Sequence, residues 1–355
     1  MKRLFHAKEW PLLPLFLLAL VILFLFWISL QPDFIEEKYT HFFYVFITRG
    51  LTGLTGRFAF SLSEIALYVS ILGVILLLGF AVWRQEWQLS LAAALWWAAV
   101  TVIWFYLVWG CNYFRLPLVK QLQLDAENLT PDSLALRENL LWSITMTNAA
   151  WREIPAWDLK SLNEEIEKSY RPVCATLQIA LMPGQRRPKF LLFPGWFNYT
   201  LTSGMFGPFF HEIHLNSELL PVELPFVLAH EKAHQMGFAR EAEANFLAAL
   251  ACWMSADSAV QYSGSFAVLG HFWSQAAGFS DRDTLRESIR PEVLADFAAV
   301  RQRYQKYRGA VSDFSHKSYD VYLRVNRVEG GTKNYNEVTD LIMRWRAWKT
   351  SKGGQ

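Results

Sequence analysis

The sequence is poor in cysteine and nearly balanced in charge. Its three cysteines, Cys111, Cys174 and Cys252, form no CxxC pair, so their spacing indicates neither a zinc ribbon nor a disulfide framework. The formal net charge of the 355 residues is only +2, and the charged residues are dispersed instead of forming a basic stripe. Nucleic acid is therefore not expected as a partner. The chain also contains no internal repeat and no low-complexity tract.

The chain is instead rich in apolar residues, which make up 53% of it. Three apolar runs occupy residues 11–30, 65–83 and 89–109, and each approaches the ~20 residues that cross ~30 Å of hydrocarbon as a helix. The first run exceeds the apolar core of a signal peptide, and no small-residue cleavage site follows it. We therefore expect a three-helix transmembrane region over residues 1–110.

The distribution of basic residues gives an expected orientation. Four of them flank the cytoplasmic ends of the predicted spans: Lys2, Arg3, Lys8 and Arg84. The positive-inside rule then places the N-terminus in the cytoplasm, although three cations lie in the opposite loop (Lys38, Arg49 and Arg57). With three spans, everything after Gly110 is expected outside the cytoplasm.

From residue 111 onward the hydropathy falls and helical periodicity dominates. Helices are expected at 133–154, 159–177, 225–236, 241–254 and 291–307. Two segments are predicted to be strands: Lys189 to Phe193, and Phe209 to Asn216, where residues alternate with a period of two. The expected fold class is α+β, with the membrane region followed by a mainly helical domain with a small sheet over residues 111–355.

One motif carries chemistry, the HExxH segment from His230 to His234. In a helix, positions i and i+4 share a face, so both imidazoles can bind a single Zn²⁺. Glu231 then lies beside the metal, where a carboxylate can accept a proton from water that zinc has acidified. Pro225 before the motif and Gly237 after it stand where a helix begins and ends.

A catalytic zinc needs a third protein ligand and an open fourth position. The metzincin pattern would place that ligand at Arg240, which cannot bind a metal. Glu241 and Glu243 follow, about 200° apart around a helix, so only one of them can reach the ion. The segment from Glu241 to Asn245 resembles the E-x-x-A-N acidic-ligand motif of several zincins. That resemblance implies Glu241 as ligand and Asn245 as a hydrogen-bonding partner behind it.

Two further roles are expected near the metal. Zincins bind substrate along an edge strand, which would assign this role to Glu212, His214 and Asn216. His211 and His214 would face opposite sides of that strand, so they cannot bind one metal together. A donor to the oxyanion is also expected, and the sequence leaves five candidates open: Tyr319, Tyr322, Tyr335, His271 and His316.

Motifs along most of the chain resemble one family of bacterial membrane proteins, domain-of-unknown-function family 3810. They are Trp109-Gly-x-Asn112-Tyr113, Gly207-Pro208, Glu212-x-x-x-Asn216, His230-Glu-x-Ala-His-Gln-x-Gly-Phe238, Glu241-x-Glu-Ala-Asn-Phe246, Tyr319-Asp-x-Tyr322-Leu and Gly331-x-x-x-Tyr335. The resemblance implies three spans and a zincin-like domain outside the bacterial cytoplasmic membrane. The sequence departs from the family pattern at His211 and His214.

These observations predict a membrane-anchored zinc metallopeptidase that hydrolyses peptide bonds in protein or peptide substrates. The alternative is a non-catalytic membrane receptor or scaffold that retains a zincin-like fold. Glu231 favours the enzyme, because a recognition module has no use for a general base at that position. An intramembrane protease is disfavoured, since His230 lies about 120 residues beyond the last apolar run.

Overall fold

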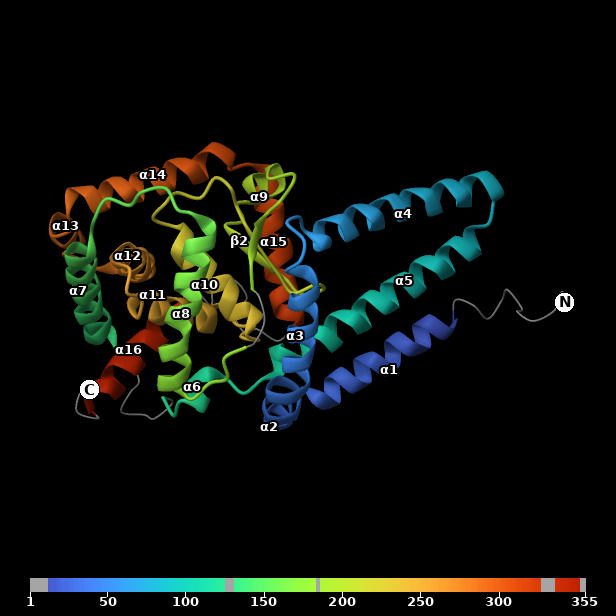
Figure 1. Cartoon of the computed structure of the whole chain (residues 1–355), viewed down its shortest axis with the longest axis horizontal. Helices are drawn as coiled ribbons and strands as arrows, with labels where there is room; N and C mark the ends of the chain where they lie inside the picture. The colour runs from blue at the N-terminus through green and yellow to red at the C-terminus, as the bar shows by residue number, and fades with distance from the viewer. Residues whose placement is uncertain (1–11, 125–130, 183–185, 327–335, 352–355) are drawn as a thin grey trace.

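Three apolar helices extend side by side from one end of the molecule (Figure 1). They are α1 (Leu12–Ile28), α4 (Leu62–Arg84) and α5 (Trp87–Val108). The computed structural model describes residues 12–124, 131–182, 186–326 and 336–351. Within those residues, α4 and α5 are each long and apolar enough to cross a membrane. The chain therefore has two or three candidate spans.

The third candidate span depends on a bent segment. After α1 the chain turns by 97° into one continuous helical stretch. This stretch consists of α2 (Pro32–Phe34), a π-helix (Ile35–Phe43) and α3 (Tyr44–Thr55). Pro32 occupies the first turn, where its missing N–H costs no hydrogen bond. The predicted run at 11–30 thus corresponds to α1, and the helical stretch after it was not expected from the sequence.

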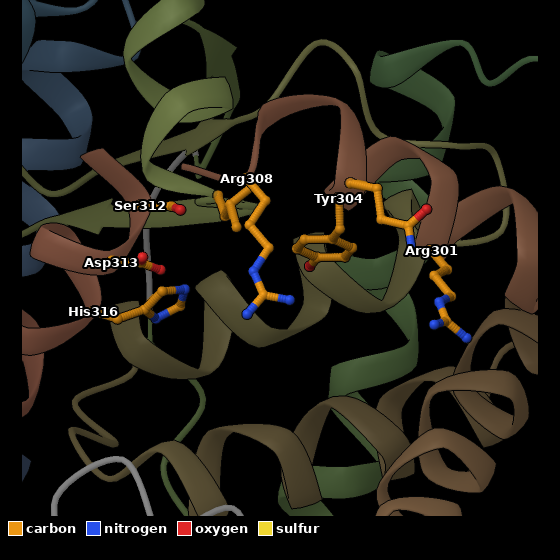
Figure 2. A pocket seen from close by; sticks show the side chains of 8 residues that line it. Arg301, Tyr304, Arg308, Ser312, Asp313 and His316 are labelled. Atoms are coloured by element: carbon orange, nitrogen blue, oxygen red, sulfur yellow. The ribbon is translucent and has the colours of Figure 1, made fainter. Parts of the chain in front are cut away.

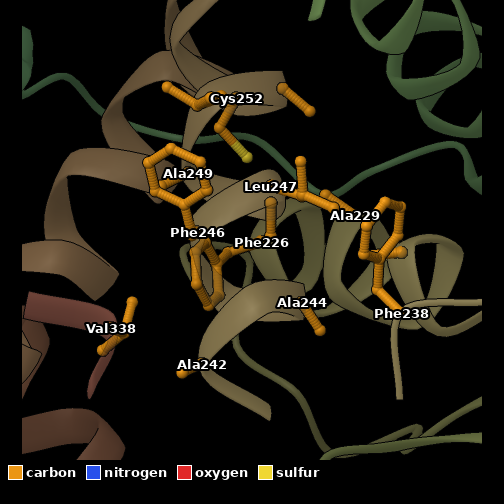
Figure 3. Packing of buried hydrophobic residues seen from close by; sticks show 14 of the residues in the cluster. Phe226, Ala229, Phe238, Ala242, Ala244, Phe246, Leu247, Ala249, Cys252 and Val338 are labelled. Atoms are coloured by element: carbon orange, nitrogen blue, oxygen red, sulfur yellow. The ribbon is translucent and has the colours of Figure 1, made fainter. Parts of the chain in front are cut away.

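The rest of the chain folds around a nearly fully buried helix, α11 (Glu241–Trp253). It packs against α10 (Leu224–Gln235) and α12 (Ser258–Gln275). Alanines along α11 let these neighbours approach closely, and Figure 3 shows this core. At Gly264 of α12, an added Cβ would lie only 2.4 Å from the Cβ of Cys252, so this crossing requires glycine.

Further helices surround this core: α6 (Leu118–Gln121), α7 (Ser133–Ala150), α8 (Leu159–Leu177), α9 (Gly195–Thr200), α13 (Arg282–Glu287), α14 (Pro291–Tyr307), α15 (Ala310–Val325) and α16 (Asn336–Ser351), with 3-10 turns at Gly110–Phe114 and Ala276–Gly278. The predicted helices at 159–177 and 291–307 have the expected bounds. The helix predicted at 133–154 ends at Ala150, because the backbone becomes extended at Trp151.

The sheet has three strands in the order β1-β3-β2. β1 (Pro188–Phe190) runs parallel to β3 (Glu212–Leu215), and β2 (Gly204–Gly207) runs antiparallel to it. Both predicted strands were too long. In particular, His211 belongs to the turn before β3, where its φ is 54°, and not to the strand.

One hydrophobic core joins the bent stretch after α1 and the end of α5 to the body of the protein. Ile35 and Tyr44 of the bent stretch, and Val108 at the end of α5, belong to the same buried cluster as Leu228 of α10. The predicted division at residue 110 falls in the 3-10 turn that begins at Gly110. The bent stretch and the end of α5 therefore share one buried core with the helix that carries the HExxH motif.

Candidate metal centre

His230, His234 and Glu241 converge on one point. The Nε2 atoms of the two histidines are 3.0 Å apart. Glu241 Oε2 lies 3.2 Å from His230 Nε2, and Glu241 Oε1 lies 3.6 Å from His234 Nε2. These three residues are the only group of at least three His, Cys, Asp or Glu side chains among the described residues whose ligand atoms could share a metal ion.

Local structure explains why these side chains meet. Pro225 lies in the first turn of α10, and the helix ends at Gln235. Gly237 then adopts a φ of 88°, and an added Cβ there would lie 2.9 Å from Asn112 Oδ1, so both conformation and space require glycine. This tight turn directs the chain back, and Glu241 becomes the first residue of α11. The third candidate ligand is therefore placed opposite the two histidines.

The donor set fits a zinc ion. Nitrogen and oxygen ligands about 2.0–2.1 Å from a tetrahedral zinc are separated from one another by about 3.3 Å. The two histidine Nε2 atoms are 3.0 Å apart, and the nearest Glu241 oxygens, Oε2 to His230 and Oε1 to His234, lie at 3.2 and 3.6 Å, so all three distances are close to this value. His234 Nδ1 lies 2.8 Å from the carbonyl oxygen of Phe238. When Nδ1 donates its proton there, the lone pair of Nε2 is free for a metal.

The electrostatics of the cluster favour positive charge. Burial lowers the pKa of His234, but the Glu241 carboxylate outweighs burial and raises this pKa to about 9. Burial likewise opposes ionisation of Glu241, yet the two histidines hold its pKa well below the usual range. The carboxylate is thus ionised beside two imidazoles, a combination suited to a divalent cation.

Glu231 lies buried next to His230, and one of its carboxylate oxygens, Oε2, has no hydrogen-bond partner among the described residues. Burial raises the pKa of this carboxyl group, and the neighbouring histidines counteract the rise only in part. Strand β2 covers it closely, since a Cβ added to Gly204 would lie 2.7 Å from Glu231 Oε1. An unpartnered buried carboxylate oxygen is free to accept a proton or bind water.

The alternative ligand Glu243 points elsewhere. It accepts a hydrogen bond of 2.8 Å from the backbone N–H of Leu118 and one of 3.2 Å from Arg240. Asn245 is buried one turn after Glu241 on α11, and its expected support of Glu241 stays a prediction. The geometry therefore brings Glu241, and not Glu243, to the histidines.

The candidate oxyanion donors separate in space. Tyr319 on α15 reaches the centre and donates a hydrogen bond to Glu241. Tyr322 stacks on Tyr319, with 6.1 Å between ring centroids, and its hydroxyl lies 3.1 Å from that of Tyr113. His271 packs against Phe226, and burial and the nearby His230 lower its pKa to about 4.

His316 lies in a separate surface hollow between α14 and α15 (Figure 2). There Arg308 extends between Tyr304 on one side and Asp313 and His316 on the other. Tyr335 lies outside the described residues. Of the four candidates among the described residues, Tyr319 is the one with a hydrogen bond to a candidate metal ligand.

The strand that was expected to bind substrate, β3, does not lie at the edge of the sheet. β3 is the middle strand, so its backbone is paired on both sides and it is not an edge strand. The Glu212 carboxylate accepts hydrogen bonds from the backbone N–H groups of Leu62 (3.0 Å) and Ser63 (2.7 Å), at the start of α4. Asn216 Nδ2 donates to the carbonyl of Thr202.

The buried cation Lys189 completes this polar cluster. Its Nζ lies 2.6 Å from Glu212 and also donates to the carbonyls of Thr55 and Phe60. His214 Nε2 lies 2.8 Å from Ser61 Oγ, the N-cap of α4. Glu212 and His214 therefore fasten α4 to the sheet. The edge strand beside Glu231, in the part of the chain that the structure describes, is β2. The period of two in the sequence could not distinguish a middle strand from an edge strand.

The sequence also contained no sign of the residues that contact the C-terminal end of α10, the helix that carries the two histidines. Arg115 donates two hydrogen bonds to Glu36, at 2.9 and 2.6 Å, and one of 3.0 Å to the carbonyl of Gly237. Tyr44 donates to the carbonyl of Gln235 at 2.8 Å. These contacts join the bent stretch after α1 to the end of α10, and they depend on pairs far apart in sequence.

Comparison with known proteins gives one family. No curated protein and no solved structure matches the chain. Residues 39–343 match the model described as protein of unknown function DUF3810, and this region includes the metal cluster, the sheet, α4 and α5. The chain therefore belongs to the DUF3810 family.

Proposed function

We propose that this protein is a membrane-anchored zinc metallopeptidase. The observation that carries the proposal is the convergence of His230, His234 and Glu241 at zinc-ligand separations, with the buried carboxylate of Glu231 beside them. The two histidines and Glu241 would hold the ion. A zinc ion bound in such a site lowers the pKa of a water molecule and polarises a carbonyl group.

The residues of the chain would then perform the proton transfers. Glu231 accepts the proton of the attacking water and returns it to the departing amine. The unpartnered Glu231 Oε2 supports this role, because no other described side chain uses that oxygen. Tyr319, which reaches the cluster through Glu241, is the best placed of the candidates to donate a hydrogen bond to the developing oxyanion.

The peptide substrate would bind along β2. This strand is at the edge of the sheet, and Gly204 at its start lies directly against Glu231. A peptide that pairs with an exposed strand edge is recognised mainly through its backbone. The substrate role first expected for Glu212, His214 and Asn216 thus passes to the backbone of residues 204–207. The proposed site lies next to the membrane, on the extracytoplasmic side.

The test uses the full chain in lipid nanodiscs. Zinc content is measured by elemental analysis, and peptide-library cleavage is followed by mass spectrometry. Glu231→Gln should keep one zinc per chain and lose about 10²- to 10⁴-fold in rate, the usual contribution of general acid-base catalysis. Glu218→Gln is the matched control, because Glu218 is exposed and pairs with Lys306. The rate of peptide cleavage by Glu218→Gln should equal that of the unmodified protein.

Three results would contradict the proposal in whole or in part. If the protein binds zinc with full occupancy but cleaves no library peptide, the receptor or scaffold reading replaces the enzyme. If Glu231→Gln cleaves at the unmodified rate, Glu231 is not the base. A chain that binds no zinc rejects the metal assignment itself.

A further inference from the structure

A group of exposed apolar side chains surrounds the point where α4 leaves the body of the protein. Two come from the loop before α4, Phe58 (37% exposed) and Phe60 (39%). Three come from the segment between β1 and the first turn of α9: Leu192 (60%), Phe193 (64%) and Trp196 (66%). We call these five residues the aromatic rim. The run from Leu192 to Trp196 contains no charged residue, and every residue in it is exposed.

Hydrogen bonds fix the rim to the first turn of α4. The carboxylate of Glu64 accepts from the backbone N–H groups of Leu192 (2.8 Å) and Phe193 (3.1 Å). The rings of Phe193 and Tyr68 meet edge to face, with their centroids 5.6 Å apart. These contacts fix the position of the rim along the axis of α4, beside its first and second turns.

That height can be compared with the thickness of a membrane. α4 has 23 residues, which at about 1.5 Å per residue gives a helix of roughly 34 Å. The hydrocarbon core is about 30 Å thick, so a spanning α4 has only about one turn to spare at its two ends together. Residues bonded to Glu64 and Tyr68 consequently lie at the boundary between lipid headgroups and hydrocarbon.

We propose that the aromatic rim enters the lipid bilayer interface, so that the segment 192–196 is a second membrane contact of the body besides the helices. Aromatic side chains concentrate at this depth in membrane proteins. Irregular backbone cannot enter hydrocarbon with unpaired N–H groups, and Glu64 supplies acceptors for two of them. The occupant of this surface is lipid because the rim continues the lipid-facing surface of α4.

This contact has a consequence for the metal centre. The segment from Trp196 runs through α9 and Leu201 directly into β2, whose first residue, Gly204, lies against Glu231. If the rim is immersed in the bilayer interface, it would hold β2, and with it the Glu231 side of the candidate metal centre, close to the membrane surface. The inference requires neither zinc nor catalysis, so it can fail or succeed independently of the proposed function.

The experiment places an environment-sensitive fluorophore at single cysteines in the full chain, one copy per nanodisc. The three native cysteines are buried and leave the introduced thiols as the accessible ones. The test variants are Leu192→Cys and Trp196→Cys. Leu72→Cys, exposed in the middle of α4, reports the deep membrane, and Thr284→Cys on α13 reports water. In Figure 1, α13 lies at the opposite end of the molecule from α4.

Lipids that carry a nitroxide quencher near the glycerol or near the chain end then give the depth. The proposal expects blue-shifted emission at residues 192 and 196 and stronger quenching by the shallow nitroxide than by the deep one. Residue 72 should show the reverse order, and residue 284 neither effect. Emission at 192 and 196 equal to that at 284 would overturn the proposal. Blue-shifted emission without lipid quenching would also overturn it, because a protein would then cover the rim.

Discussion

The indole nitrogen of Trp109 donates a hydrogen bond of 3.0 Å to the backbone carbonyl of His234, across 125 residues of sequence. Trp109 is the first residue after α5, and its ring also lies edge-on to the His234 imidazole. A candidate metal ligand is therefore one contact away from the end of a candidate membrane span. Distance along the sequence gave no indication of this, because the HExxH motif follows α5 by about 120 residues.

The choice between the two acidic residues gives the first prediction. Glu241→Gln should weaken zinc binding much more than Glu243→Gln, because only Glu241 lies at ligand distance from both histidines. Competition with a fluorescent zinc chelator measures both affinities under the same conditions. Glu243→Gln should instead lower stability, since Glu243 accepts from Leu118 and Arg240. A larger loss of zinc affinity in Glu243→Gln would transfer the ligand role to that residue.

Tyr319 provides the second prediction. Tyr319→Phe removes only the hydroxyl that donates to Glu241. Loss of a hydrogen bond to a metal ligand typically costs about 10- to 100-fold in affinity or activity. If Tyr319 only orients Glu241, zinc affinity should fall. If it also stabilises the oxyanion, kcat should fall with zinc saturating.

Tyr322→Phe is the matched control for this comparison, because Tyr322 stacks on Tyr319 but its hydroxyl lies against Tyr113. Burial raises the pKa of Tyr322 to about 12, so its hydroxyl stays protonated near pH 7. Equal effects of the two substitutions would remove the specific role given to Tyr319.

The parts of the fold that the sequence predicted well depend on local rules. α10 and α11 were found within about one residue because proline, glycine and the i, i+4 spacing mark a helix over a few positions. The convergence of His230, His234 and Glu241 follows from those two helices and the short turn at Gly237. All three apolar runs are helices, and two of them are long enough to cross a membrane alone, since length and hydropathy are properties of a single segment.

The parts that were wrong or missed depend on contacts between distant segments. The alternation around Glu212 correctly indicated a strand, but whether it is an edge depends on β2. β2 was missed because it has only four residues and begins and ends with glycine. The buried pair of Glu36 and Arg115 likewise joins residues that no periodicity relates.

The number of spans gives the third prediction. If the bent pair of α1 and Pro32–Thr55 crosses the membrane as one span, α4 and α5 make a total of three. An odd number places the two ends of the chain on opposite sides. A reporter that is active only outside the cytoplasm, fused after Gln355, should then be active, while the same reporter fused before Met1 should be silent. Activity at both ends or at neither would show two spans.

The fourth prediction concerns the buried pair of Glu212 and Lys189, which fastens α4 to the sheet. Glu212→Gln removes the charge that faces Lys189 Nζ at 2.6 Å and leaves a buried ammonium without its counter-ion. Breaking a buried pair in this way costs about 3–5 kcal/mol, a large part of the ~5–15 kcal/mol that stabilises a typical domain. Thermal unfolding of the solubilised chain measures the loss. Glu218→Gln, which breaks the exposed pair with Lys306, should cost at most about 1 kcal/mol.

The same pair predicts a pH dependence. Burial raises the pKa of Glu212, but hydrogen bonds from His214, Lys189 and Ser63 outweigh burial and hold it far below its ordinary value of 4.5. The unfolded chain therefore binds this proton at a higher pH than the folded chain, so acid favours unfolding. The stabilisation is complete above about pH 4.5 and decreases as the pH falls below that value. In Glu212→Gln this component of the acid sensitivity should disappear, and adding Lys189→Met should recover part of the lost stability. An unchanged acid limb in Glu212→Gln would mean that other carboxylates set the acid stability of the fold.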